Sequence, residues 1–255
     1  MARYDEEYFE SHCGVPYRRG TGGWEAFFGG IADAIVDRFG PRTVLDAGCA
    51  IGFLVEALRA RGVDAEGIDI SEYAISQVPA ALRPYVRVAP ITEELAHDYD
   101  LITCIEVLEH VSEEEAAAAV ANFARHTQRV LFSSTPDDDK EPTHVNVRPP
   151  EYWSELFARS GLFNDPTIDA SFVTPHAMVY RCEEVGRFAG MVESLVRSER
   201  ASHTAEQARL AAEVARLRLD LELQVRALRG SLAIAEREAA AWRELQQRSG
   251  WRIFA

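Results

Sequence analysis

Residues 104–111 of the chain read CIEVLEHV and place three side chains suited to acid, base or metal chemistry close together. Glu106, Glu109 and His110 are spaced i, i+3 and i+4, which predicts that a helical turn brings them to one face. Two carboxylates and an imidazole are suitable ligands for a divalent cation, and they also suit an acid and base pair. Ordinary polar groups of a loop are the third interpretation, and the spacing leaves all three open.

A further histidine, His144, lies in the later segment STPDDDKEPTHVNVRPPEYW, residues 134–153. This segment follows a predicted strand and is long enough to fold back over the same region. Its prolines at positions 142, 149 and 150 restrict the backbone. We therefore interpret His144 as a general base or a substrate contact.

The elements that must position these residues alternate between short apolar runs and amphipathic segments, which is typical of a parallel sheet covered by helices. The predicted fold is α/β, with a seven-stranded, Rossmann-like, doubly wound sheet. We expect five strands at residues 43–48, 64–70, 85–90, 99–105 and 129–135, and a closing hairpin from 168–172 and 176–182. We expect helices at residues 53–62, 112–126 and 149–161, the second with a capping box formed by Ser112 and Glu115.

The turn after the first predicted strand, VLDAGCAIGF at residues 44–53, is where such sheets bind ligands. Gly48 and Gly52 allow close backbone approach, but their spacing differs from that of a dinucleotide pyrophosphate cradle. Asp46 would oppose a pyrophosphate and attract a cation. Asp69 ends the second strand, where a carboxylate can accept hydrogen bonds from both hydroxyls of a ribose. Ribose and positive charge without phosphates describe S-adenosylmethionine; the alternative is that the glycines serve packing alone.

The motifs VLDAGCAIGF, GIDIS and YDLITCIEVLEHV together resemble those of class I S-adenosylmethionine-dependent methyltransferases, over about residues 30–182. The resemblance implies that the methionine part of the cofactor is lined by Asp46, Gly48, Ala50 and Gly52. It also implies that Asp69 holds the ribose and that Ile70 packs on the adenine. The polar contacts of the adenine stay unassigned, because APIT follows the third strand where many relatives carry an acidic residue.

The ExxEH motif with a distant histidine resembles the divalent-metal site of small-RNA 2'-O-methyltransferases, and ubiquinone-pathway O-methyltransferases carry a similar ExxEH. This resemblance implies that Glu106, Glu109, His110 and His144 hold Mg²⁺ or Mn²⁺ against the acceptor oxygen. Many methyltransferases carry a similar motif without a metal, with Glu106 contacting the cofactor and His110 ordering the loop. His110 and His144 are the candidate catalytic residues in either case.

The first 40 residues are rich in tyrosine, arginine and glycine and resemble the lid that precedes the first strand in this family. Arg18 or Arg19 is a candidate partner for the cofactor's carboxylate, and we assign Arg19 to the cofactor site. The alternative is an exposed arginine without a ligand.

The charge of the chain, −14 overall, is unevenly distributed, with −17 in residues 1–185 and +3 in residues 186–255. The prolines end at Pro175 and the cysteines at Cys182. These shifts predict a methyltransferase domain at 1–185 that includes the lid at 1–40, and a separate tail at 186–255. A strongly acidic domain repels phosphate backbones, so we expect no nucleic-acid partner.

The tail shows apolar residues at steps of three and four, which is typical of a coiled coil. An exposed apolar seam requires a partner helix, so we expect self-association as a dimer or trimer; the alternative is a helix folded back on the domain. The closing RSGWRIFA resembles a segment that follows coiled coils in bacterial surface-glycan assembly proteins.

These observations predict an S-adenosylmethionine-dependent O-methyltransferase that acts on a saccharide or another small hydroxylated acceptor. An amino-sugar N-methyltransferase and a non-catalytic coiled-coil scaffold are the two alternatives. The cysteines show no CxxC spacing and we find no apolar run of membrane-spanning length. We therefore expect free thiols, no membrane span and a cytoplasmic protein.

Overall fold

The computed structural model describes residues 4–182 and, beyond them, residues 207, 209, 210, 212–214, 216, 217, 239–241, 243 and 244. The chain divides into two compact units, Met1–Phe188 and Ala189–Ala255. Within the described part of the chain, no helix has both the length and the apolar character that crossing a membrane requires.

A seven-stranded sheet forms the centre of the first unit, in the order β3-β2-β1-β4-β5-β7-β6. The strands are β1 (Thr43–Ala47), β2 (Asp64–Asp69), β3 (Val86–Val88), β4 (Leu101–Ile105), β5 (Arg129–Ser133), β6 (Leu162–Asn164) and β7 (Met178–Cys182). The first five strands pair in parallel, whereas β7 is antiparallel to both β5 and β6. The predicted seven-stranded α/β sheet is confirmed, and its order reverses between β1 and β4.

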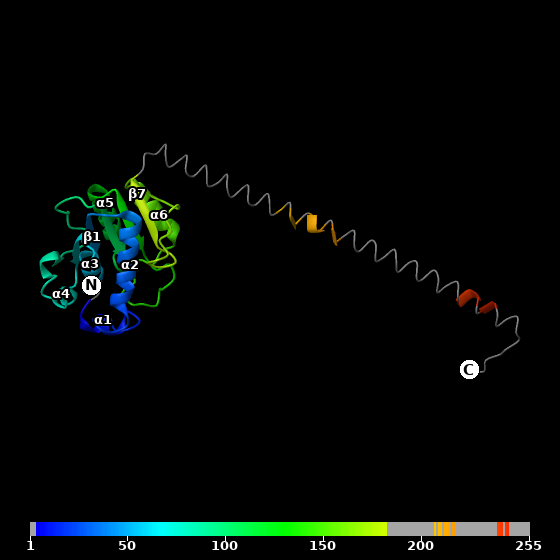
Figure 1. Cartoon of the computed structure of the whole chain (residues 1–255), viewed down its shortest axis with the longest axis horizontal. Helices are drawn as coiled ribbons and strands as arrows, with labels where there is room; N and C mark the ends of the chain where they lie inside the picture. Colours follow the sequence, from blue (N-terminus) through cyan, green and yellow to red (C-terminus); the bar gives the residue numbers. More distant parts are fainter. Residues whose placement is uncertain are drawn as a thin grey trace. The chain divides into compact units, whose positions relative to one another are not determined.

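Helices cover both faces of this sheet, as Figure 1 shows. They are α1 (Glu6–Ser11), α2 (Trp24–Phe39), α3 (Phe53–Arg59), α4 (Glu72–Ser76), α5 (Glu113–His126) and α6 (Pro150–Arg159), with 3₁₀ turns η1 (Arg83–Tyr85) and η2 (Leu108–His110). Adjacent β1 residues point to opposite faces, so Val44 packs with α2 and α3 while Leu45 packs with α5 and α6. Burial on both faces accounts for the nearly continuous apolar strands.

The predicted capping box of α5 is confirmed. The Ser112 hydroxyl accepts a hydrogen bond from the Glu115 N–H at 3.2 Å, and the Glu115 carboxylate accepts one from the Ser112 N–H at 3.0 Å. Two N–H groups that the helix cannot satisfy internally are thus paired. This fixes the start of α5 at Glu113, three residues after the ExxEH motif ends at His110.

The predicted closing hairpin is wrong in one strand. The strand that pairs with β7 is β6, at Leu162–Asn164, and residues 168–172 form turns instead. The carboxylates of Asp165 and Asp169 accept hydrogen bonds from the N–H groups of Thr167 and Ser171, at 3.0 and 2.9 Å. Such local side-chain bonds hold the backbone in turns and remove it from the sheet.

The described residues beyond 182 are helical, and Leu210, Val214 and Leu217 are exposed among them. Most of the predicted coiled-coil seam and all of RSGWRIFA lie outside the described residues. The coiled coil and its self-association therefore stay predictions.

Candidate functional site

A pocket opens at the carboxyl ends of β1, β2, β3 and β4, beside the point where the strand order reverses. Its wall comes from the loops after these strands and from the N-terminal segment. The lining residues are Tyr4, Tyr8, Phe9, Gly48, Ala50, Asp69, Ile70, Pro90, Ile91, Thr92, Glu106, Val107, His110, Val111 and Glu115. Five of the predicted cofactor residues thus share one cavity: Gly48, Ala50, Asp69, Ile70 and Glu106.

The turn after β1 needs glycine at its first position. Gly48 has φ +89°, and a Cβ there would overlap the Val107 side chain that follows β4. Ala50 also adopts a left-handed conformation, with φ +47°, which is uncommon for a residue with a Cβ. The turn keeps this shape because the N–H groups of Gly48 and Cys49 both donate to the Ile68 carbonyl, at 2.8 and 3.0 Å.

The Asp69 side chain joins this turn to the second strand. One carboxylate oxygen accepts the Ala50 N–H and the other the Ser71 N–H, each at 2.8 Å. Burial raises the pKa of Asp69, although these two hydrogen bonds oppose the shift. Each oxygen has a further lone pair for a ligand hydroxyl. The adjacent Ile70 is 46% exposed and offers an apolar surface to the same pocket.

A second pocket adjoins the first and shares Tyr8, Phe9, Gly48, Ala50, Glu106 and His110 with it. Its remaining wall is largely aromatic, from Tyr17, Trp24, Phe27 and Phe28, and it also contains Asp46, Glu109 and His144. Asp46 is buried, and its carboxylate accepts the Thr103 hydroxyl at 2.7 Å. Burial raises the pKa of Asp46 to about 7, against the lowering effect of this hydrogen bond.

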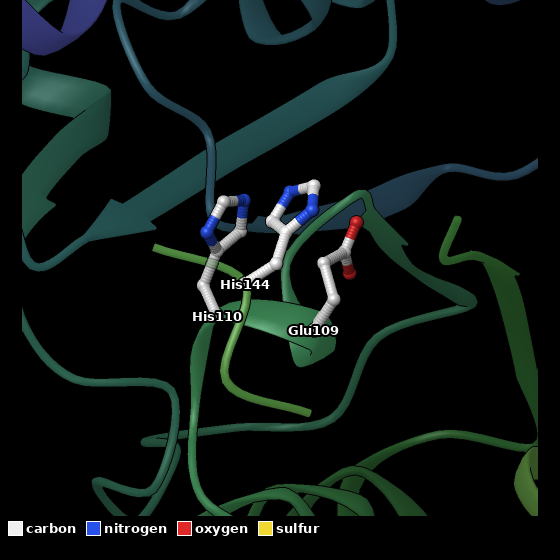
Figure 2. Close-up of side chains that lie close together, drawn as sticks. All are labelled: Glu109, His110 and His144. Atoms are coloured by element: carbon white, nitrogen blue, oxygen red, sulfur yellow. The ribbon is translucent and has the colours of Figure 1, made fainter. Parts of the chain in front are cut away.

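Glu109, His110 and His144 form a compact cluster in the second pocket (Figure 2). One ligand atom from each lies within 4.8 Å of the others, and the two imidazole centroids are 4.6 Å apart. Glu109 is fully buried, and neither carboxylate oxygen has a hydrogen-bond partner among the described residues. Burial, followed by the neighbouring Glu106, raises the pKa of Glu109 well above its usual value. A buried carboxylate with free lone pairs fits a bound cation.

The two imidazoles suit the same role. Burial, assisted by neighbouring His144, lowers the pKa of His110 to about 4, so the ring is neutral at pH 7. The Nδ1 of His144 donates to the Asp138 carbonyl at 2.6 Å, so Nε2 is the ring nitrogen that faces no such partner in the described part of the chain and can serve a ligand. Neutral imidazoles with a fixed tautomer are typical metal ligands and general bases.

Glu106, the fourth predicted ligand, is not part of this cluster of ligand atoms. The helical turn begins only at Leu108, and Glu106 precedes it with φ +52°. The prediction that one turn brings all three ExxEH side chains to a single face is therefore wrong. Glu106 lines both pockets instead, and its Oε1 lies 3.2 Å from His176 Nε2.

Arg19 and Gly52 lie outside the linings of both pockets. The Arg19 guanidinium pairs with Glu56, donates to the Ile51 carbonyl at 3.1 Å and lies over the Phe53 ring. It thus ties the N-terminal segment to the turn after β1. Gly52, with φ +77°, is the N-cap residue of α3 and stands at the end of the turn after β1. Their cofactor contacts stay predictions.

Several pocket residues were not singled out by the sequence motifs. Tyr4 precedes α1 and Tyr8 lies in it; α1 is the dark blue helix at the bottom of the domain in Figure 1. The hydroxyls of Tyr4 and Tyr8 approach the His110 carbonyl and Nε2 at 3.3 and 3.4 Å. His176 comes from the loop before β7. These contacts join segments far apart in the sequence, so no local motif reveals them.

A family model described as a methyltransferase domain matches residues 25–186. Two similar curated proteins are both named ubiquinone biosynthesis O-methyltransferase. One, from Neisseria meningitidis serogroup C (strain 053442), is 30% identical over 60% of this chain and 66% of its own length. The other, from Nitrosomonas europaea, is 29% identical over 64% of this chain and 68% of its own length. The matched region thus spans about two thirds of these relatives.

Two solved structures share the fold at low sequence identity. The magnesium protoporphyrin IX methyltransferase of Synechocystis PCC 6803 with bound S-adenosylmethionine is 20% identical, covers 71% of this chain and 97% of that one, and has a TM-score of 0.51. The sugar N-methyltransferase KedS8 from Streptoalloteichus sp ATCC 53650 is 16% identical, covers 65% and 90%, and has the same TM-score of 0.51.

Proposed function

Because the chain belongs to the methyltransferase domain family, we propose that it transfers a methyl group from S-adenosylmethionine to a hydroxyl oxygen of a small acceptor. The chain is an S-adenosylmethionine-dependent methyltransferase, and a hydroxyl oxygen is its proposed acceptor. The observation that carries it is the buried, unpartnered Glu109 carboxylate beside the imidazoles of His110 and His144. A hydroxyl has a high pKa and needs such assistance, whereas an uncharged amine does not.

The first pocket is proposed to hold the adenosine part of S-adenosylmethionine. Asp69 would accept the ribose hydroxyls, and Ile70 would cover one face of the adenine. The turn at Gly48 and Ala50, with Asp46 behind it, would receive the methionine part. Glu106 lines both pockets and would lie near the transferred methyl group. Each proposed role suits the chemistry of its side chain and the pocket that the residue lines.

Glu109, His110 and His144 are proposed to hold Mg²⁺ or Mn²⁺ beside the acceptor. Such an ion, when bound, stabilises the negative charge of an ionising hydroxyl. The protein's own contribution is to supply one carboxylate and two imidazoles, with the Asp138 carbonyl accepting from Nδ1 of His144. If no ion binds, His144 is the proposed general base, because its Nε2 carries the lone pair.

Within the class of hydroxylated acceptors we propose a saccharide, as the closing RSGWRIFA implies. The aromatic wall formed by Tyr17, Trp24, Phe27 and Phe28 supports a ring-shaped acceptor, because aromatic faces pack well against flat apolar surfaces. We also propose that the protein works in the reducing cytoplasm, because its four cysteines are free thiols.

The test of the metal role is methyl transfer before and after chelation, using sugars and a catechol as hydroxyl acceptors and an amino sugar as the amine acceptor. We expect activity on a hydroxyl acceptor to disappear with chelator and to return with Mg²⁺ or Mn²⁺. Glu109→Gln should lose this response, whereas the exposed control Glu155→Gln on α6 should retain it. Activity that survives chelation refutes the metal role, and methylation of the amine alone refutes O-methylation.

A further inference from the structure

A chain of polar contacts leads from the metal-ligand candidate His110 to the N-terminal segment. The Nδ1 of His110 lies 3.0 Å from the Thr143 hydroxyl oxygen, which in turn lies 3.0 Å from Glu141 Oε1. The other oxygen of Glu141 lies 3.0 Å from Nδ1 of His12, immediately after α1. We call His110, Thr143, Glu141 and His12 the polar relay.

The chemistry of these groups fixes the direction of each hydrogen bond. An ionised carboxylate only accepts, so Glu141 accepts the Thr143 hydroxyl, the Thr143 N–H at 3.2 Å and the His12 Nδ1–H. The one hydroxyl proton of Thr143 points to Glu141, so its oxygen must accept from His110 Nδ1. His110 is therefore held with its proton on Nδ1 and its lone pair on Nε2.

The opposite side of the ring agrees with this assignment. The Tyr8 hydroxyl lies 3.4 Å from His110 Nε2, and a phenol donates readily to an imidazole lone pair. Tyr8 belongs to α1, and His12 follows that helix directly. The same short segment therefore contacts His110, at one end of the relay, and supplies His12, at the other end. The N-terminal lid and the orientation of His110 are thus physically connected.

We propose that Thr143 and Glu141 are positioning residues that fix the tautomer of His110, and that His12 links them to the N-terminal lid. This inference rests on the proposed function, because the Nε2 lone pair is what a metal ion or an acceptor proton would use. Outer hydrogen-bond partners of ligating histidines are typically worth about 10- to 100-fold in metal affinity or activity.

The test uses the full chain with ¹⁵N-labelled histidine, and His110→Ala identifies the His110 signals by NMR. We expect the Nδ1–H tautomer in the wild type and in Thr143→Ser, which keeps the hydroxyl. Thr143→Val should yield a mixture of tautomers. Glu141→Ala should populate the Nε2–H tautomer, because the Thr143 hydroxyl is then released to donate to Nδ1. If Thr143→Val and Glu141→Ala both keep the wild-type Nδ1–H tautomer, the proposal is overturned.

Titration with Mn²⁺ supplies a second readout. We expect Thr143→Val to weaken binding by about 10- to 100-fold and Thr143→Ser to stay near the wild type. The control is Thr167→Val, whose hydroxyl donates to the Asp165 carboxylate at 2.5 Å outside both pockets. Thermal unfolding of each variant checks its fold. If the wild type binds no Mn²⁺, the proposed metal role fails, but the NMR tautomers still decide the positioning role.

Discussion

At the scale of single residues, Asp69 is the side chain on which cofactor binding should depend most. We expect Asp69→Ala to raise the Kd for S-adenosylmethionine by about 10- to 100-fold, because hydrogen bonds to a charged acceptor are worth about 1.5–3 kcal/mol. Calorimetric titration measures this directly. The matched control is Asp100→Ala, which also loses two backbone hydrogen bonds, from Arg42 and Thr43, but lies away from both pockets. Equal affinities of the two variants contradict the ribose role.

Gly48 offers a second test, which separates backbone conformation from steric fit. Gly48 and Gly62 have similar positive φ angles, +89° and +83°, but a Cβ would overlap Val107 only at Gly48 and meets open space at Gly62. Gly62→Ala should cost about 1–2 kcal/mol of unfolding free energy, the penalty of a left-handed conformation. Gly48→Ala should cost more and should also weaken cofactor binding. Denaturant unfolding and calorimetry check both, and equal effects of the two substitutions contradict the close approach.

Asp46 predicts a pH dependence of cofactor binding. Its pKa of about 7 means that the carboxyl is largely neutral below pH 7 and ionised above it. A cationic ligand favours the ionised form, so affinity should rise with pH by up to about tenfold per unit below pH 7 and then level off. Titrations between pH 6 and 8 measure this rise. In Asp46→Asn the rise should be absent, and a slope equal to that of the wild type would exclude Asp46 as its source.

The sequence motifs located the turn after β1, Asp69 and the ExxEH residues, but not the conformation of Glu106 or the contacts of Thr143 and Glu141. Asp69 and Gly48 were predictable, because a strand end and a tight turn each leave a clear local pattern. Glu106 was not, because its i, i+3 spacing suggested a helix while its φ of +52° lies outside one. Thr143 and Glu141 were not predicted, because Thr143 contacts His110, which lies 33 residues away in the sequence, and Glu141 contacts His12, which lies 129 residues away. Such contacts depend on tertiary packing and leave no local signal.

At the scale of elements, helix α1 lines both pockets and is held in place by a small hydrophobic core of its own. Phe9 is buried there with Ile51, Phe53 and Ala74, apart from the two main core clusters. We expect Phe9→Ala to loosen the N-terminal segment and weaken cofactor binding, with a smaller loss of global stability. Hydrogen exchange of residues 4–20 and calorimetry measure the two effects.

The control for this element is Phe157 on α6, which is buried in a main core cluster. Phe157→Ala should lower the free energy of unfolding by about 3–5 kcal/mol, as large-to-small core substitutions do. It should not selectively increase exchange in residues 4–20. If Phe9→Ala leaves both that exchange and the cofactor Kd unchanged, α1 is not a lid for the pocket.

Most elements were predictable because apolar runs and capping residues are local signals, as the Ser112 capping box shows. Helices α1, α2 and α4 were not predicted, and the strand before β7 was predicted at the wrong residues. Residues 168–172 have strand-like composition, but Asp165 and Asp169 bind the backbone two residues ahead and favour turns. The three-residue strand β6 is too short to leave a period-two pattern.

At the scale of the whole molecule, the sequence predicts that the tail associates with a second copy of the chain. The described tail residues Leu210, Val214 and Leu217 are helical and exposed, which leaves an apolar face for a partner. We expect the full chain to be a dimer or trimer by light scattering. A chain ending after Phe188 should be monomeric and should keep its cofactor affinity. A monomeric full chain contradicts self-association.

The central claim is that Asp69 and the turn after β1 form a site for a ribose attached to a positively charged sulfur, without a place for phosphates. The most direct measurement is calorimetric titration of the purified full chain with S-adenosylmethionine and, separately, with NAD. We predict saturable binding of S-adenosylmethionine and no binding of NAD at the same concentrations. Binding of NAD with no response to S-adenosylmethionine would contradict the account.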